Sequence, residues 1–183
     1  MEADSRRDPL YRDVVCQHVT ELPVLGVLVR FETNAPEALA VIEKAYGAWR
    51  AIAGRPELLA TTSARVRLIV HPGDEGGDGY PGIRSRMPDN ERLMLHTAGS
   101  LALADASRLE AVAYVTPALV ATEHHFQRGV LDALTLLLVT RVDRQPVHAA
   151  GVAREDVALL LAGPSGVGKS TVAYAAARAG YRL

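Results

Sequence analysis

Residues 163–170 (GPSGVGKS) constrain the fold more than any other part of this 183-residue chain. They fit the pattern G-x-x-x-x-G-K-[ST], the P-loop, in which a glycine-rich turn joins a strand to a helix. The apolar run VALLLA at 157–162 comes immediately before the turn and predicts a strand that is buried on both faces. Residues 169–179 predict the helix that follows, and Gly180 is placed to end it. This order predicts an α/β fold organised around the turn.

The residue types in this turn suit the binding of nucleotide phosphates. Glycines allow successive backbone N–H groups to curl around phosphate oxygens, and the start of the following helix adds a partial positive charge. Lys169 would reach the β- and γ-phosphates of ATP, and the Ser170 hydroxyl would hold Mg²⁺. Lys169 is one of only two lysines in the chain, which argues against a chance surface lysine. The predicted nucleotide-binding residues are Gly163, Pro164, Ser165, Gly166, Val167, Gly168, Lys169, Ser170 and Thr171.

The remaining sequence predicts an N-terminal α+β region over residues 1–115, followed by a P-loop nucleotide-binding region over residues 116–183. A Gly-, Pro- and acid-rich stretch at 72–90 is the best candidate for a long loop. Strands are expected at 24–31, 65–70, 93–96, 101–104, 111–115, 146–152 and 157–162, and helices at 37–52, 116–141 and 169–179.

Composition narrows the class of protein. The net charge is -1 and aromatic residues make up 5% of the chain, so neither the basic surface nor the stacking platform of a nucleic-acid-binding protein is expected. The single cysteine, Cys16, excludes an internal disulfide and a multi-cysteine zinc site. The charged N-terminus lacks the apolar core of a secretory signal, and no apolar run reaches the roughly 20 residues that span a bilayer. These features predict a cytoplasmic protein that does not enter membranes.

Residues on both sides of the turn resemble HPr kinase/phosphorylase and its relatives. In that family a strand containing His precedes a similar loop at similar spacing, as 146–152 (PVHAAGV) does here, and the helix ends in a phrase like 180–183 (GYRL). The resemblance covers residues 146–183 and does not extend to residues 1–115. It implies an ATP-dependent kinase that transfers the γ-phosphate of Mg-ATP to a serine of a protein substrate. It also implies that His148 lies near the transferred phosphate, as a catalytic residue beside Lys169.

The sequence departs from that family after the helix. In the family, the next strand ends in paired aspartates that bind Mg²⁺ and act as acid and base, whereas this sequence ends at Leu183. We therefore expect a piece of a longer kinase. Two alternatives stay open, namely a nucleotide-binding regulatory module without catalysis and a P-loop phosphotransferase that acts on a small molecule. A sheet edge left open by missing strands invites association, so we expect residues 146–183 to be partly ordered, or the chain to aggregate or form homo-oligomers.

Other polar residues have simpler interpretations. Asp105 follows an apolar run in the manner of a metal-binding strand, but a carboxylate that caps a turn is favoured. Glu155 and Asp156 predict a hairpin turn. His124 and His125 would point about 100° apart on a helix and cannot easily share a metal, so we expect a solvated pair.

Overall fold

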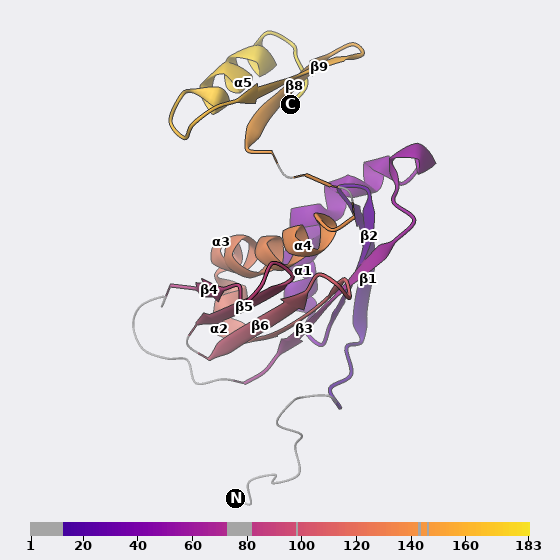
Figure 1. Cartoon of the computed structure of the whole chain (residues 1–183), viewed down its shortest axis with the longest axis vertical. Helices are drawn as coiled ribbons and strands as arrows, with labels where there is room; N and C mark the ends of the chain where they lie inside the picture. The colour runs from indigo at the N-terminus through magenta and orange to yellow at the C-terminus, as the bar shows by residue number, and fades with distance from the viewer. Residues whose placement is uncertain (1–12, 73–81, 98, 143, 146) are drawn as a thin grey trace, which may run out of the picture. The chain divides into compact units, whose positions relative to one another are not determined.

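The computed structural model describes residues 13–72, 82–97, 99–142, 144–145 and 147–183. The chain forms two compact units, Met1–Arg144 and Gln145–Leu183, and both contain strands and helices (Figure 1). The mixed α/β architecture expected from the sequence is therefore present. The boundary expected after residue 115 is displaced, because the helical segment that follows it packs on the sheet of the first unit. The first unit ends at Arg144 instead.

The first unit is built on a seven-stranded sheet in the order β1-β2-β3-β7-β6-β5-β4. The pairs β2–β3 and β3–β7 are parallel, and the other pairs are antiparallel. The strands are β1 His18–Val24, β2 Val27–Thr33, β3 Ser63–Val70, β4 Arg84–Arg86, β5 Arg92–Thr97, β6 Ser100–Asp105 and β7 Glu110–Val115. The helices are α1 Pro36–Tyr46, α2 Pro117–Ala121, α3 Glu123–Phe126 and α4 Asp132–Val139, with 3₁₀ turns at Gly47–Ile52 and Pro56–Leu58 and a π turn at Gln127–Leu131.

The helices cover one face of this sheet and bury the core of the unit. Helices α1, α3 and α4 lie together on one side of the sheet (Figure 1). Along β3 and β7 the buried side chains alternate with more exposed ones, as expected of strands with one covered face. Phe31 on the sheet and Phe126, Leu134 and Leu138 on the helices are completely buried. The opposite face of the sheet carries charged and partly exposed apolar side chains, including Arg65 and Leu103.

Several elements of the first unit differ from the sequence prediction. Strand β1 was not expected, β4 lies within the loop expected at 72–90, and the helix expected at 37–52 is α-helical to Tyr46 and continues as a 3₁₀ turn. The strand expected at 24–31 is divided by a tight turn, in which Leu25 and Gly26 have φ of 51° and 83°. A Cβ at residue 26 would lie 2.2 Å from the Leu58 carbonyl oxygen, so the close approach requires glycine. The single helix expected at 116–141 is interrupted at Thr122 (φ −86°, ψ 63°), whose hydroxyl donates to the Ala118 carbonyl. Of the loop expected at 72–90, residues 73–81 lie outside the described part.

The second unit is a hairpin with one helix. Strands β8 Ala149–Arg154 and β9 Val157–Ala162 are antiparallel, and α5 Lys169–Arg178 follows the glycine-rich turn. Arg182 returns to β8, where it exchanges two backbone hydrogen bonds of 2.8 Å with Ala153. Helix α5 packs mainly on β8, and Val152 and Ala173 are buried.

The expectation that 157–162 is buried on both faces is wrong for the structure as it stands. Leu159 and Leu160 are 56% and 69% exposed. The reason is that, in the described part of the chain, β9 pairs with β8 alone, and α5 makes most of its contacts with β8. Among the described residues, no helix is long and apolar enough to cross a membrane.

Candidate phosphate-binding site

The glycine-rich turn between β9 and α5 has a backbone that ordinary residues rarely adopt. Gly163, Gly166 and Gly168 have φ of 156°, 81° and 95°. A Cβ added at residue 166 or 168 would meet no atom within 4 Å, so glycine is required there by the backbone conformation rather than by space. At residue 163 a Cβ would also approach the Val167 side chain to 3.1 Å. The turn is closed by a 3.4 Å hydrogen bond from the Val167 amide to the Pro164 carbonyl.

The start of α5 offers hydrogen-bond donors toward this turn. Gly168 is the N-cap residue, and its carbonyl accepts from the Val172 amide at 3.0 Å. No side chain caps the helix, and no acidic residue occupies its first turn. The N–H groups of the first turn have no partner within a helix, and they carry the positive end of the helix dipole. The combination is suited to an anion with several oxygens.

The Lys169 side chain folds back over the turn. Its ammonium donates to the carbonyl oxygens of Gly163 at 2.9 Å and Pro164 at 2.8 Å. An ammonium has three protons, so these two bonds leave one N–H available. The positive charge is therefore held at the turn, at the N-terminal end of α5. Ser170, the expected Mg²⁺ ligand, and Thr171 are exposed in the first turn of α5.

His148 lies at the same end of the hairpin as the turn. It directly precedes β8, whose first residue Ala149 is paired with Ala162, the last residue before Gly163. His148 is exposed. The strand register thus brings His148 and residues 163–171 to one end of this unit, as the spacing in the sequence requires.

The carboxylates of the second unit lie at the opposite end. Glu155 and Asp156 form the turn between β8 and β9, as predicted, and six residues of strand separate them from the glycine-rich turn, roughly 20 Å at 3.4 Å per residue. Within the described residues, no group of three His, Cys, Asp or Glu side chains is placed to hold a metal ion. A metal here would depend on Ser170 and on oxygens of the ligand.

The upstream polar candidates have the structural roles expected of them. Asp105 accepts hydrogen bonds from the Ser107 hydroxyl at 2.5 Å and from the Ser107 and Arg108 amides, and these bonds lower the pKa of its carboxyl. It caps the turn between β6 and β7. The His124 and His125 rings lie edge to face with centroids 5.8 Å apart.

The contacts that hold the segment after α5 on the hairpin are only weakly indicated by the sequence. The Arg154 guanidinium lies 5.6 Å from the centre of the Tyr181 ring, and Arg182 donates to the Glu155 carbonyl at 3.0 Å. These contacts, with the pairing of Arg182 and Ala153, fasten the segment after α5 to the hairpin. Residues 180–183 are conspicuous in the sequence only through the family resemblance, because nothing in their composition indicates this return to β8.

Comparison of the chain with protein-family profiles, with curated proteins and with solved structures finds no match.

Proposed function

We propose that residues 163–171 bind the phosphates of Mg-ATP. The observation that carries this proposal is the conformation of the turn, in which Gly166 and Gly168 adopt positive φ directly before an uncapped helix and Lys169 holds its charge over the turn. Backbone amides, the helix dipole and the ammonium would all favour phosphate oxygens. Bound Mg²⁺ would supply charge neutralisation between the phosphates, with Ser170 as its ligand from the protein.

The reaction that we propose is transfer of the γ-phosphate to a serine of a protein substrate, by a kinase related to HPr kinase. Support comes from the resemblance of residues 146–183 and from the position of His148 at the phosphate end of the hairpin. His148 would contact the transferred group, and Lys169 would neutralise charge that develops on it.

A second function, nucleotide binding without catalysis, is favoured by one observation. Phosphoryl transfer needs groups that hold the metal and accept the hydroxyl proton. The two acidic side chains of this unit, Glu155 and Asp156, lie at the end of the hairpin opposite the glycine-rich turn. In that case the chain would act as a regulatory module that senses ATP.

Calorimetric titration with Mg-ATP tests the binding. Lys169→Ala should weaken binding by about tenfold to a hundredfold, because a charge-assisted hydrogen bond is lost. Lys44→Ala is the matched control, since it removes the other lysine, which pairs with Glu123 in the first unit. Equal affinity in the Lys169 variant and the unmodified chain would refute the proposal.

Transfer of labelled phosphate from ATP to a serine-containing protein distinguishes the two functions. A kinase should label the acceptor and lose this activity in His148→Ala while retaining ATP binding. Binding without any transfer would favour the regulatory module.

A further inference from the structure

The face of the large sheet that the helices leave open carries its side chains in rows across the strands. In one row Val112, Leu103 and Met94 are direct neighbours on β7, β6 and β5, and Arg67 on β3 is paired with Val112. Leu103 and Met94 are each 38% exposed. The row is therefore an open apolar strip that ends in a guanidinium.

The next row, two residues along each strand, is charged. Arg65, Glu110, Asp105 and Arg92 are neighbours on β3, β7, β6 and β5. Arg65 lies beside Glu110 and forms a 2.6 Å ion pair with Glu32, and Arg92 lies 3.8 Å from Asp105. The two adjacent carboxylates in the middle of the row are thus flanked by one arginine on each side. Arg92 is paired with Asp105, and Arg65 is shared between Glu110 and Glu32.

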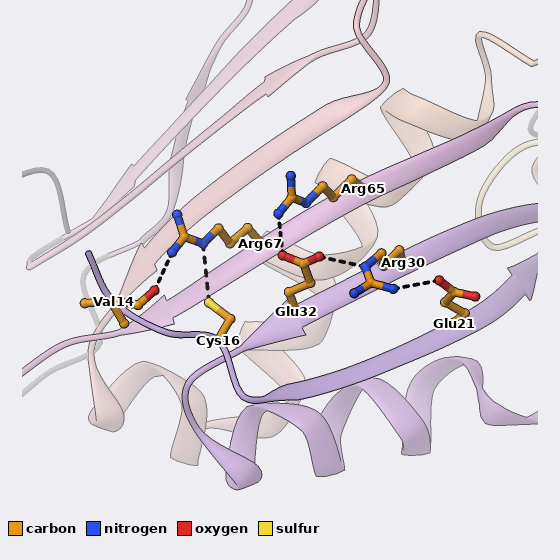
Figure 2. A network of polar contacts seen from close by, with 7 residues as sticks. All are labelled: Val14, Cys16, Glu21, Arg30, Glu32, Arg65 and Arg67. Carbon is orange, nitrogen blue, oxygen red and sulfur yellow. Dashed lines mark hydrogen bonds and ion pairs between the residues drawn. The ribbon is translucent and has the colours of Figure 1, made fainter. Parts of the chain in front are cut away.

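Two further arginines of this face, Arg67 and Arg108, have no such pairing with a carboxylate in the described part of the chain. Arg67 donates from Nε to the Cys16 sulfur at 3.3 Å and from Nη2 to the Val14 carbonyl, and neither partner is a carboxylate (Figure 2). By contrast, Figure 2 shows Arg65, Glu32, Arg30 and Glu21 in one continuous chain of ion pairs. Arg108 lies in the turn between β6 and β7.

The two rows form the floor of a cavity of about 440 Å³. Arg67 and Arg108 contribute to its lining, and Pro88 bounds it as well. The lining holds four arginines and two acids, and Arg65 among the arginines is also paired with Glu32 on β2, outside the lining. Its volume lies within the roughly 300–1,000 Å³ range of small-molecule sites, which combine an apolar floor with a few converging polar groups.

We propose that this cavity binds a small organic anion. The apolar body of the ligand would cover Val112, Leu103 and Met94. Its carboxylate or phosphate would be held by Arg67 at the end of this strip, and Arg108, in the turn beyond the Glu110 and Asp105 row, would add a second positive charge. A guanidinium presents two parallel donors that match both anions. The site is separate from the glycine-rich turn and does not depend on the function proposed for that turn.

Titration of the chain with 2-naphthoate tests this site, with 2-naphthalenemethanol as the uncharged probe of similar shape. We expect 2-naphthoate to bind at least about tenfold more tightly than the alcohol, and Arg67→Gln or Arg108→Gln to remove about tenfold of its affinity. Arg128→Gln, on the helical side of the unit, is the matched control and should bind as the unmodified chain does. Leu103→Glu places a negative charge on the floor and should abolish binding of the anion, although both arginines remain in the chain. This variant keeps the test decisive if Arg67→Gln does not fold.

The same titration with 2-naphthyl phosphate in a Lys169→Ala chain separates carboxylate from phosphate ligands, because the glycine-rich turn is then impaired. Tighter binding of one anion identifies the preferred group and supports the site. Equal binding of the alcohol, no change in the Arg67, Arg108 and Leu103 variants, or no binding of either anion at 1 mM would overturn the proposal. Tighter binding of an acidic peptide than of either probe would also overturn it, by assigning the face to a macromolecule.

Discussion

Gly168→Ala should loosen the start of α5 although the new methyl group meets nothing. A Cβ at residue 168 has open space within 4 Å, so the whole effect comes from the φ of 95°. A left-handed backbone costs an L-residue roughly 1–2 kcal/mol, which changes the equilibrium between the closed and opened first turn by about 5- to 30-fold. Gly151→Ala is the matched control in the same unit, because its Cβ would make an ordinary 3.7 Å contact with Leu160 and its backbone is not left-handed.

Amide hydrogen exchange along α5 measures this effect directly, since exchange reports local opening of the helix. The Val172 amide, which donates to the Gly168 carbonyl, should exchange about 5- to 30-fold faster in Gly168→Ala and at an unchanged rate in Gly151→Ala. If both variants protect Val172 equally, the positive φ at residue 168 does not hold the turn, and its backbone conformation does not require glycine.

Three further predictions concern the first unit, whose unfolding can be followed by the fluorescence of its single tryptophan, Trp49. Leu134→Ala should lower the free energy of unfolding by about 2–5 kcal/mol, since Leu134 is fully buried. Leu136→Ala, at a position that is 40% exposed, should lower it far less. Equal losses in the two variants would contradict the packing described. Tyr46→Phe should cost about 1 kcal/mol in urea titrations, because the Tyr46 hydroxyl donates to Asp132 at 2.8 Å, and Asp132→Asn should reduce that cost. Burial acts to raise the pKa of Glu32, but hydrogen bonds from Arg65 and Arg30 outweigh burial and lower this pKa. The ionised Glu32 therefore stabilises the fold above the pKa of an unfolded glutamate, and this stabilisation is lost as the pH falls through the lower folded pKa. The difference in unfolding free energy between the unmodified chain and Glu32→Gln should shrink on acidification, and a difference independent of pH would refute the role of these ion pairs.

The local patterns predicted many of the elements, because the information for them is local. The 65–70 strand and the helix beginning near Glu37 correspond to β3 and α1, and Pro36 occupies the first turn of α1. The break at Thr122 was not predictable from periodicity, since apolar residues continue at helical spacing through the interruption.

Tertiary contacts decided the features that sequence periodicity missed. The turn at Gly26 depends on the approach of the Leu58 carbonyl, which lies 32 residues away in the chain. The apolar run 157–162 predicts a buried strand. How exposed the strand is depends on which elements pack on it, and the run does not specify them. The order of strand, glycine-rich turn and helix at 157–178 was predictable, because the apolar run and the glycine spacing are local signals. The cavity over the open face of the sheet was not predictable, because its rows join residues from four strands.

Backbone amide NMR of the full chain during titration with Mg-ATP tests the central claim most directly. If residues 163–171 bind the phosphates, the largest shifts should occur at Gly166, Gly168, Lys169 and Ser170, and they should disappear in Lys169→Ala. Binding of Mg-ATP with no shift in this turn, or with equal shifts in the Lys169 variant, would contradict the account.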